Sequence, residues 1–425
     1  MAMKYRIVIR AFTLRRDLPQ AYVLAKILEH LGCETIIACT RNYQTVLKYW
    51  KPHAAVINTV GKINNTSDVS PDTKVIVWPA EGARAPHSSD AVWLKELMPE
   101  GTVDKASLYI LWGDYTRRAF LQYFPKELDE KIVVCGHPKL DLIKFKPKVE
   151  CPRKSIGFLT KFPGLNFYNR KAPITLLMEN PEGSKKVLHL QIDQFFLMMK
   201  VIEKLAEKKI SSKISVRPHP LEAPEEYETL RKKYPDIIEI DNSFDFADWA
   251  SRQKVILTPA SSSFIDLTLL NVPVVSIDNI LIKEHSIIEE TQKKVVVTSL
   301  DGNSYKPQNF DELVEMASSD LKLIPEPPEM EKYNRDVYDW PSEGSAIKRT
   351  AEAIISYLDK CKDLKRTSPV FPKFALDAYD WLQFYKAKRL SGQHHENFNY
   401  KEGFHKIPDY LDKIVENIIA NRPTL

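Results

Sequence analysis

Short runs rich in Val and Ile alternate with amphipathic stretches of helical length, and this alternation is what most constrains the fold. In the first third of the chain the runs read as strands at Tyr5–Ile9, Thr35–Ala38, Ala54–Asn58, Val75–Trp78, Tyr109–Trp112 and Ile132–Cys135. A helix is expected at Gln20–Leu31, with Gly32 ending it. Strands of this composition that alternate with helices predict a parallel sheet covered by helices on both faces.

The same alternation starts again after a short linker. Phe145–Lys154 is basic and contains two prolines, as expected of a linker. Beyond it, strands are expected at Ser155–Leu159, Lys213–Val216, Ile237–Ile240, Val255–Leu257 and Val274–Ile277, and helices at Gln194–Lys208, Glu222–Lys233 and after Ser261. We therefore predict an α/β protein with two doubly wound Rossmann-like domains facing a cleft, at residues 1–150 and 151–343. Residues 344–425 are expected to form a crossover helix, over Gly344–Leu358, and a helical tail.

Composition excludes several classes of function. The chain has 61 Lys and Arg against 56 Asp and Glu in 425 residues, and a net charge of +5 is too small to indicate nucleic acid as a partner. Its 13 glycines include no GxGxxG or Walker-type loop. Five cysteines without a CxxC pair predict reduced thiols in a cytoplasmic protein. No apolar stretch approaches the ~18–20 residues of a membrane span, and the first segment reads as a strand and not as a signal peptide.

The last part of the tail mixes Lys and Arg with aromatic residues, namely Phe371, Phe374, Tyr379, Trp381, Phe384 and Tyr385. Two interpretations stay open. These residues could form helices that pack back across both domains, or they could touch the inner face of a membrane or an acceptor polymer.

The strongest candidate site is Ser215–Pro220, with the sequence SVRPHP, at the end of an expected strand. Two prolines delay the next helix, so Arg217 and His219 are expected to project from a stiff loop at the carboxyl edge of the sheet. Arg holds a phosphate with a fixed fork of donors, and His can donate to a phosphate and transfer a proton. An exposed His without a role is the alternative.

A cluster of serines follows another expected strand. Ser261, Ser262 and Ser263 stand between the strand Val255–Leu257 and the next helix. Serines in this position are often simple helix caps. Hydroxyls and backbone N–H groups at a helix start also favour an anion, so we expect phosphate binding here, with Thr258 and Lys161 completing the donor site.

Two carboxylates are candidates for the chemistry itself. Asp193 is expected at the start of the long helix, where it would be either a cap or a catalytic group. Glu81 follows the strand Val75–Trp78 and would face the cleft from the acceptor side, unless it belongs to a solvated loop. The polar stretch Pro163–Lys186 is interpreted as an active-site loop. No cluster with the spacing of metal ligands is visible, so we predict neither a metal nor a cofactor.

Together these motifs resemble the GT-B glycosyltransferases that use CMP-activated acid sugars. The shared features are Arg-Pro-His-Pro at 217–220, the serine cluster followed by a hydrophobic helix and Val-Pro-Val-Val, and Glu81-Gly82 after a strand of the first domain. Bacterial sialyltransferases and the Kdo transferases of capsule and lipopolysaccharide synthesis belong to this group. Gln191-Ile-Asp193 resembles the Gln-x-(Glu/Asp) motif of the capsular Kdo transferases. Leu14–Ala25 and Lys131–Leu142 are similar to segments of uncharacterised surface carbohydrate biosynthesis proteins. The resemblance covers roughly residues 5–355.

The resemblance implies that CMP binds to the second domain, with its phosphate at His219 and the serines. It implies that Glu81 deprotonates the acceptor hydroxyl and that Asp193 attacks the anomeric carbon in a retaining reaction. Ala80 stands where many relatives carry another acid. The expected substrates are a CMP-linked acid sugar such as CMP-Kdo and a surface polysaccharide or glycolipid acceptor.

Three alternatives remain open at this point. A CDP-glycerol or CDP-ribitol phosphotransferase of the teichoic-acid type also combines a His-Pro loop with serines before a hydrophobic helix. A UDP-sugar transferase or epimerase is a further enzyme class. A catalytically silent GT-B scaffold that binds a glycan is the non-enzymatic alternative.

Overall fold

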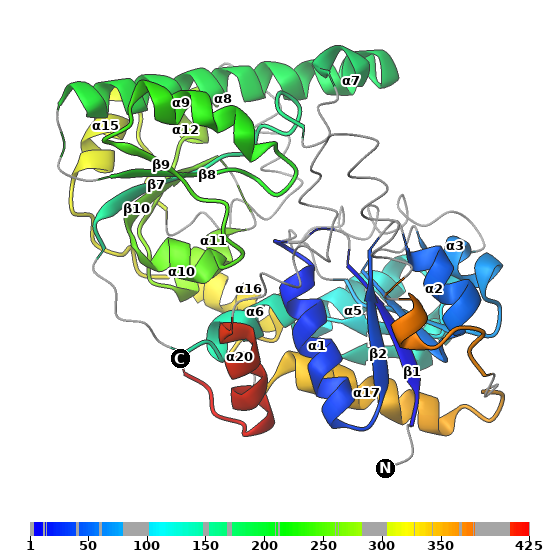
Figure 1. Ribbon diagram of the computed structural model, residues 1–425. Coiled ribbons are helices and arrows are strands. Elements are labelled where there is room, and N and C mark those ends of the chain that lie inside the picture. Colours follow the sequence, from blue (N-terminus) through cyan, green and yellow to red (C-terminus); the bar gives the residue numbers. More distant parts are fainter. Residues whose placement is uncertain are drawn as a thin grey trace. The chain divides into compact units, whose positions relative to one another are not determined.

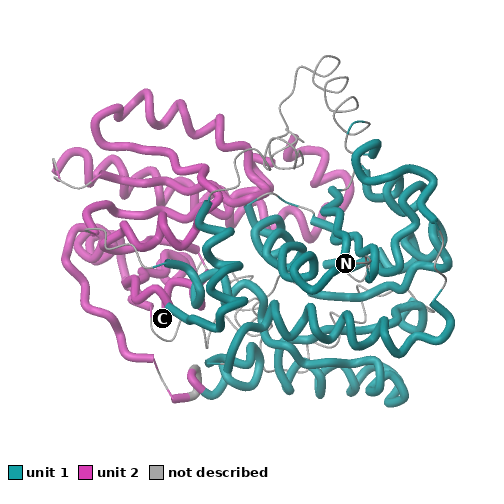
Figure 2. The backbone as a smooth tube through the Cα atoms, turned by 60° about the horizontal axis from the view of Figure 1, so that its bottom comes forward, with its two compact units in different colours: residues 1–82, 86–148, 332–425 teal, residues 83–85, 149–331 magenta. Residues whose placement is uncertain are grey.

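The chain forms two compact units, drawn in different colours in Figure 2. The computed structural model describes residues 4–79, 102–147, 153–167, 172–282, 304–364, 368–378 and 409–424, apart from 12, 14, 40, 41, 59–61, 209, 211, 212, 260, 262, 327, 342 and 377. Unit 1 comprises Met1–Gly82, Pro86–Lys148 and Lys332–Leu425, and unit 2 comprises Ala83–Ala85 and Val149–Glu331. The chain returns to unit 1 at Lys332, within the segment that the sequence assigned to the second domain.

Unit 1 is built on a six-stranded parallel sheet with the strand order β2-β1-β3-β4-β5-β6. Its strands are β1 (Arg6–Arg10), β2 (Glu34–Ala38), β3 (Ala54–Ile57), β4 (Lys74–Val77), β5 (Leu108–Leu111) and β6 (Ile132–Val134). All five residues of β1 are buried because the strand lies inside the sheet and has helices over both faces. The six strands lie within a residue or two of the positions predicted from Val/Ile-rich runs.

Helices cover both faces of this sheet (Figure 1). They are α1 (Leu18–His30), α2 (Tyr43–Trp50), α3 (Ile63–Val69), α5 (Asp114–Tyr123), α6 (Pro138–Lys144), α16 (Pro328–Tyr338), α17 (Ala346–Lys360) and α20 (Tyr410–Ile419), with short 3₁₀ turns at Val103–Lys105 and Lys126–Lys131. One core lies between the sheet and α2, and it is centred on Val8, Tyr43 and Trp50. The helix α1 packs against α17 and α20.

A buried carboxylate joins the start of α17 to α6, which follows the last strand of the sheet. Asp141 in α6 accepts hydrogen bonds from Ser345 Oγ at 2.5 Å and from the backbone N–H of Ile347 at 2.8 Å, at the N-terminus of α17. Burial raises the pKa of Asp141 to about 6, although these donors oppose the shift. The helix dipole of α17 therefore has a carboxylate at its positive end.

Part of the tail also packs on unit 1. The backbone N–H groups of Val370 and Phe371 donate to the carbonyl of Tyr49, and the rings of Tyr49 and Phe371 lie 5.3 Å apart. Asp412 at the start of α20 accepts a hydrogen bond of 2.7 Å from the hydroxyl of Tyr22 in α1. Residues 379–408 lie outside the described residues, so the two interpretations of their aromatic residues remain open.

Unit 2 has a five-stranded parallel sheet in the order β11-β10-β7-β8-β9. The strands are β7 (Ser155–Leu159), β8 (Ile214–Arg217), β9 (Ile238–Ile240), β10 (Gln253–Thr258) and β11 (Val274–Ser276). The helices are α7 (Pro173–Glu179), α8 (Pro181–Glu207), α9 (Glu228–Lys233), α10 (Phe246–Ser251), α11 (Ser263–Leu269), α12 (Asp278–Leu281) and α15 (Phe310–Ser318), with a 3₁₀ turn at Pro224–Tyr227. The main core of the unit lies under α8 and α15.

The stretch Pro163–Lys186, predicted as a loop, is largely helical. It contains α7 and the first turns of the 27-residue α8. Pro173 and Pro181 were interpreted as loop residues, but each begins a helix, where proline has no backbone hydrogen bond to lose. Asn180 caps α8 by accepting from the backbone N–H of Gly183 at 3.2 Å. The prediction that Asp193 starts the long helix is therefore wrong, because α8 begins at Pro181.

Among the residues that the structure describes, none of the helices is long and apolar enough to cross a membrane.

Candidate functional site

The candidate site in unit 2 lies where the direction of the strand connections reverses. The chain passes from β7 to β8 on one side and later from β10 to β11 on the other, so the reversal falls between β7 and β10. Ligands of open parallel sheets bind outside the carboxyl ends of the strands at such a point. The residues that follow these strands are Thr160 and Lys161 after β7, and Pro259 and Ser261 after β10.

His219 sits two residues beyond β8, next to this point. Its Nδ1 accepts the backbone N–H of Leu221 at 3.1 Å, so the neutral ring carries its proton on Nε2. The backbone N–H of His219 donates to Thr160 Oγ1 at 3.2 Å, which ties the His219 loop to the end of β7. The imidazole is half-buried. A half-buried ring with an Nε2–H donor can bind a phosphate oxygen at this edge.

The other predicted donor-site residues lie on the same edge. In the register of the sheet, Leu257 of β10 pairs with Phe158 of β7, so Thr258 comes one residue after this pair on β10 and Thr160 two residues after it on β7. Lys161 is exposed and Ser263 is half-buried at the start of α11. Ser261 Oγ accepts the backbone N–H of Ser263 at 3.2 Å, and the buried Thr258 hydroxyl donates to the carbonyl of Pro259 at 2.8 Å. Ser261 thus acts as a local cap, and Ser262 lies outside the described residues.

Arg217 is held by protein partners. Its guanidinium pairs with Asp241 and donates to the carbonyl of Ser243 at 2.7 Å. It also lies 5.6 Å from the ring centres of both Phe246 and Trp249. Its side chain is 6% exposed and that of Asp241 14% exposed. Arg217 therefore anchors the loop after β9 and α10. Binding of a phosphate to Arg217 stays a prediction, and the phosphate would have to bind the guanidinium alongside Asp241 and Ser243.

Gln191 and Asp193 point to opposite sides of α8. Gln191 is buried and accepts the backbone N–H of Gly164 at 2.8 Å, next to the loop after β7. Two residues along an α-helix correspond to a rotation of about 200°, so Asp193 faces away from that loop. Its carboxylate is 33% exposed and lies 3.7 Å from Nε2 of His189. Glu81 lies outside the described residues, so its role stays a prediction.

Sequence reasoning did not identify the buried acid beside His219. Glu222 is fully buried and its carboxylate accepts from Thr160 Oγ1 at 2.7 Å, the backbone N–H of Phe162 at 2.6 Å and the Tyr227 hydroxyl at 2.5 Å. The sequence placed Glu222 at the start of a helix, where an exposed acid is ordinary. Only its position three residues after His219, at the edge of the site, could have drawn attention to it.

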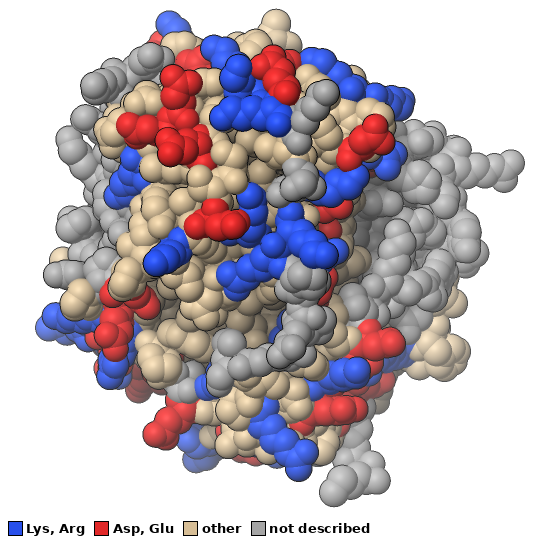
Figure 3. All heavy atoms as spheres, turned by 90° about the vertical axis from the view of Figure 1, so that its left-hand side faces the viewer, with Lys and Arg blue, Asp and Glu red and all other residues tan. Residues whose placement is uncertain are grey.

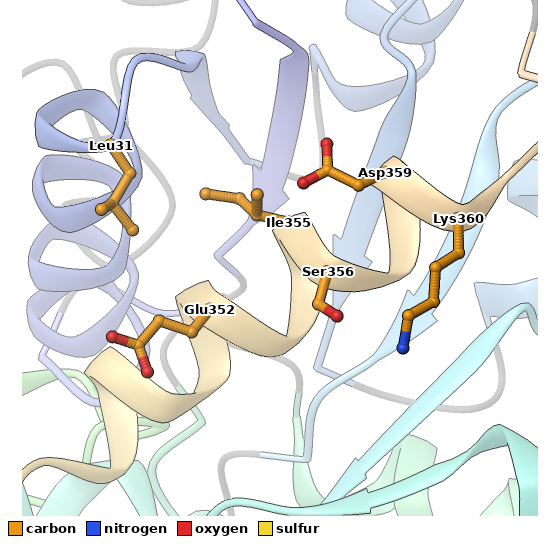
Figure 4. Close-up of a pocket in the computed structure, with 6 residues that line it drawn as sticks. All are labelled: Leu31, Glu352, Ile355, Ser356, Asp359 and Lys360. Carbon is orange, nitrogen blue, oxygen red and sulfur yellow. The ribbon is translucent and has the colours of Figure 1, made fainter.

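A surface pocket in unit 1 lies far from the carboxyl edge of its sheet (Figure 4). It measures about 330 Å³, and its lining combines the end of α1 with one face of α17, at Leu31, Glu352, Ile355, Ser356, Asp359 and Lys360. Leu31 follows α1 just before β2 begins, so this pocket is at the amino ends of the strands, where parallel sheets do not usually bind ligands.

Charge and metal-ligand patterns add no second site. On the face drawn in Figure 3, Lys and Arg lie interspersed with Asp and Glu. Within the described part of the chain, no group of three or more His, Cys, Asp or Glu side chains could hold a metal ion.

Two doubly wound units in one chain, with a helical C-terminal region, make this a GT-B-type fold. S. aureus MnaA, solved with UDP, matches with a TM-score of 0.50 and 14% identity over 86% of this chain and 99% of that chain. A UDP-N-acetylglucosamine 2-epimerase from Listeria monocytogenes matches with a TM-score of 0.50 and 12% identity over 87% and 99%. The wall teichoic acid polymerase TagF reaches a TM-score of 0.49 at 12% identity, over 84% and 88%, and we draw nothing from it. At these identities the likeness concerns the fold alone. No family model and no curated protein matches the chain.

Proposed function

We propose that the chain is a glycosyltransferase that takes an acid sugar, Kdo or a related one, from a CMP-linked donor and transfers it to a surface polysaccharide or glycolipid. The observation that carries the proposal is the His219 corner. A half-buried imidazole with its proton on Nε2 stands at the carboxyl edge of the unit 2 sheet, beside the reversal point, and Lys161 and Ser263 follow strands that end at the same edge.

The proposed chemistry at this edge is stabilisation of the departing CMP. When the bond between the sugar and the phosphate breaks, negative charge grows on the phosphate oxygens. An Nε2–H donor from His219 and the ammonium of Lys161 would receive that charge, and hydroxyls of the serine cluster would add neutral donors. Donors already held in place are effective because they need no reorganisation during the reaction.

The two acids enter the proposal from the family resemblance. Glu81 would deprotonate the acceptor hydroxyl, and Asp193 would take the sugar before the acceptor does. For Asp193 the test is Asp193→Asn, which should abolish transfer while CMP affinity stays within about twofold of the wild type. Normal turnover in this variant would remove Asp193 from the mechanism. The proposed CMP site would be unaffected by that result, because Asp193 faces away from the Gly164 loop.

The test of the donor class is calorimetric titration of the full chain with CMP, CDP, UDP and GDP. We expect CMP to bind most tightly and His219→Asn to weaken it at least tenfold, since one charge-assisted hydrogen bond is lost. Lys233→Gln is the matched control, because Lys233 pairs with Glu203 on the surface of the same unit. Binding of CMP that is unaffected by His219→Asn would contradict the proposed site.

A UDP-sugar enzyme is the second candidate, and the likeness to S. aureus MnaA, which was solved with UDP, favours it. It predicts that UDP and not CMP gives the strongest heat of binding in the same titration. Incubation with UDP-N-acetylglucosamine, followed by chromatography of the products, would then separate a transferase from an epimerase.

A further inference from the structure

A buried acid, a threonine and the His219 loop form one connected group in unit 2. Glu222 Oε2 accepts from Thr160 Oγ1 at 2.7 Å, and Thr160 Oγ1 in turn accepts the backbone N–H of His219 at 3.2 Å. The backbone N–H of Glu222 donates to the carbonyl of His219 at 2.9 Å. The His219 corner is therefore attached to Glu222 twice, once through its own backbone and once through Thr160.

The direction of each hydrogen bond in this group depends on the charge of Glu222. A hydroxyl has one hydrogen, and that of Thr160 is donated to the carboxylate. Its lone pairs are then available to accept from His219. Glu222 also accepts the backbone N–H of Phe162 at 2.6 Å and the Tyr227 hydroxyl at 2.5 Å, so these partners and Thr160 all donate to it. A carboxylate, which only accepts, fits this arrangement.

Burial makes the arrangement rigid. Glu222 is fully buried and Thr160 is 4% exposed, so neither can exchange its partners for bulk water. The buried Tyr227 beside them has its pKa raised well above its usual value, first by desolvation and then by the charge of Glu222. Its hydroxyl thus remains a donor to the carboxylate.

We propose that Glu222 is a positioning residue: through Thr160 it fixes the backbone of the His219 corner and so holds the His219 ring, with its proton on Nε2, in the geometry that binds the phosphate. The phosphate contact rests on the proposed function, whereas the fixed tautomer does not. A sequence comparison would class Glu222 as an ordinary acid near a helix start.

Glu222→Gln tests the charge with little change of shape. With its NH₂ group towards Phe162, the amide meets an N–H donor. With its NH₂ group towards the two hydroxyls, these must accept from it, so the Thr160 hydroxyl loses the acceptor of its hydrogen. Thr160→Val removes the link to His219 but keeps the volume, and Thr160→Ser keeps the hydroxyl. Tyr227→Phe is the matched control, because it removes one donor to Glu222 and leaves the link through Thr160 in place.

The first measurement needs no nucleotide. Nitrogen-15 spectra of the histidine rings at pH 8, with the His219 signals assigned by their loss in His219→Asn, report the tautomer directly. We expect a single Nε2–H form in the wild type, Thr160→Ser and Tyr227→Phe, and an averaged pair of tautomers in Glu222→Gln and Thr160→Val. The second measurement is CMP affinity. We expect it to fall about tenfold in Glu222→Gln and Thr160→Val, and less than twofold in Thr160→Ser and Tyr227→Phe.

The outcomes separate the two proposals. If wild-type protein binds no CMP, the proposed function fails and the ring spectra still decide the role of Glu222. If Glu222→Gln and Thr160→Val leave the tautomer and the affinity as in the wild type, the positioning role is excluded. Urea unfolding of all four variants completes the test: Tyr227→Phe matching Glu222→Gln in every readout would mean that Glu222 only stabilises the fold. Should Glu222→Gln not fold, the Thr160→Val and Thr160→Ser pair gives the same decision.

Discussion

Each unit contains a His-Pro corner after a parallel strand, and the two corners share one local geometry. His137 follows β6 in unit 1, and His219 follows β8 in unit 2. In both, Nδ1 accepts the backbone N–H two residues later, at 3.2 Å for His137 and 3.1 Å for His219. The His ring is thus first of all a cap for the turn that follows the strand.

The surroundings of the two rings differ. His137 is 5% exposed and its ring centre lies 4.5 Å from that of Trp112 and 5.4 Å from that of Tyr338. Burial lowers the pKa of His137 to about 3, so the ring stays neutral. His219 is half-buried, and its backbone N–H donates to the hydroxyl of Thr160. The same corner therefore packs against aromatic rings in unit 1, whereas in unit 2 its ring is only half-buried.

The largest expected effect on ligand affinity distinguishes the two corners. His219→Asn and His137→Asn both keep an oxygen that can cap the turn, and both remove the Nε2–H donor. We expect at least a tenfold loss of CMP affinity for His219→Asn and less than a twofold change for His137→Asn, measured by calorimetry. Equal losses in the two variants would mean that the difference in surroundings has no functional meaning.

The residue before the second corner should matter chiefly for stability. Arg217→Met breaks a buried pair and leaves Asp241 with only the more distant guanidinium of Arg252, 3.7 Å away, so we expect a loss of up to about 3–5 kcal/mol in the free energy of unfolding. Urea unfolding measures this loss, and CMP affinity of the folded variant should change little. A large loss of affinity with nearly unchanged stability would instead make Arg217 a phosphate ligand, as the sequence suggested.

His137 in the first corner should make the free energy of unfolding depend on pH. The pKa of His137 is lower in the folded than in the unfolded chain, so the unfolded chain binds more protons and stability is lost as pH falls from about 6.5 towards 3. This loss amounts to about 2 kcal/mol between pH 7 and pH 5. Asp141, whose folded pKa is raised to about 6, acts in the opposite direction over the same range.

His137→Asn removes the first contribution and leaves the second. Between pH 7 and pH 5 the variant should therefore keep about 2 kcal/mol more of its stability than the wild type does, that is, its free energy of unfolding at pH 5 is higher by that amount relative to its value at pH 7. Urea titrations of both proteins at the two pH values measure this difference. An identical pH dependence in both would show that His137 is not held neutral by its surroundings.

The smallest expected effect concerns the residue at the start of each corner. Gly136 has φ +89°, and an added Cβ would lie 2.8 Å from Arg349 Nη2, whereas Pro218 holds the equivalent place in unit 2. Gly136→Ala should therefore cost about 1–2 kcal/mol. Pro218→Ala should cost less than about 1 kcal/mol, since alanine adopts the same backbone and only the unfolded chain gains freedom. Thermal unfolding compares the two, and the reverse order would show that the corners are not built alike.

The strands of both sheets could be predicted because buried parallel strands consist of continuous runs such as Ile7–Ile9 and Val255–Leu257, which need no tertiary information. The carboxyl-edge position of His219 followed from the same reasoning. The pairing of Arg217 with Asp241 could not be predicted, because residues 24 positions apart meet only through the pairing of β8 with β9. The N-terminal turns of α8 were missed since prolines that begin helices look like loop residues in the sequence.

Because α17 and α20 belong to unit 1 but follow unit 2 in the chain, the ribosome completes unit 2 before it completes unit 1. When Glu331 leaves the ribosome, unit 2 is complete, whereas the sheet of unit 1 still lacks the helices that pack on α1. At the usual rate of translation, the stretch from Lys332 to the end of α20 at Ile419 takes roughly 4–18 s to make. During that interval the nascent chain exposes the apolar surface of α1 that α17 and α20 cover in the finished protein, so unit 1 is open to aggregation after unit 2 has been made.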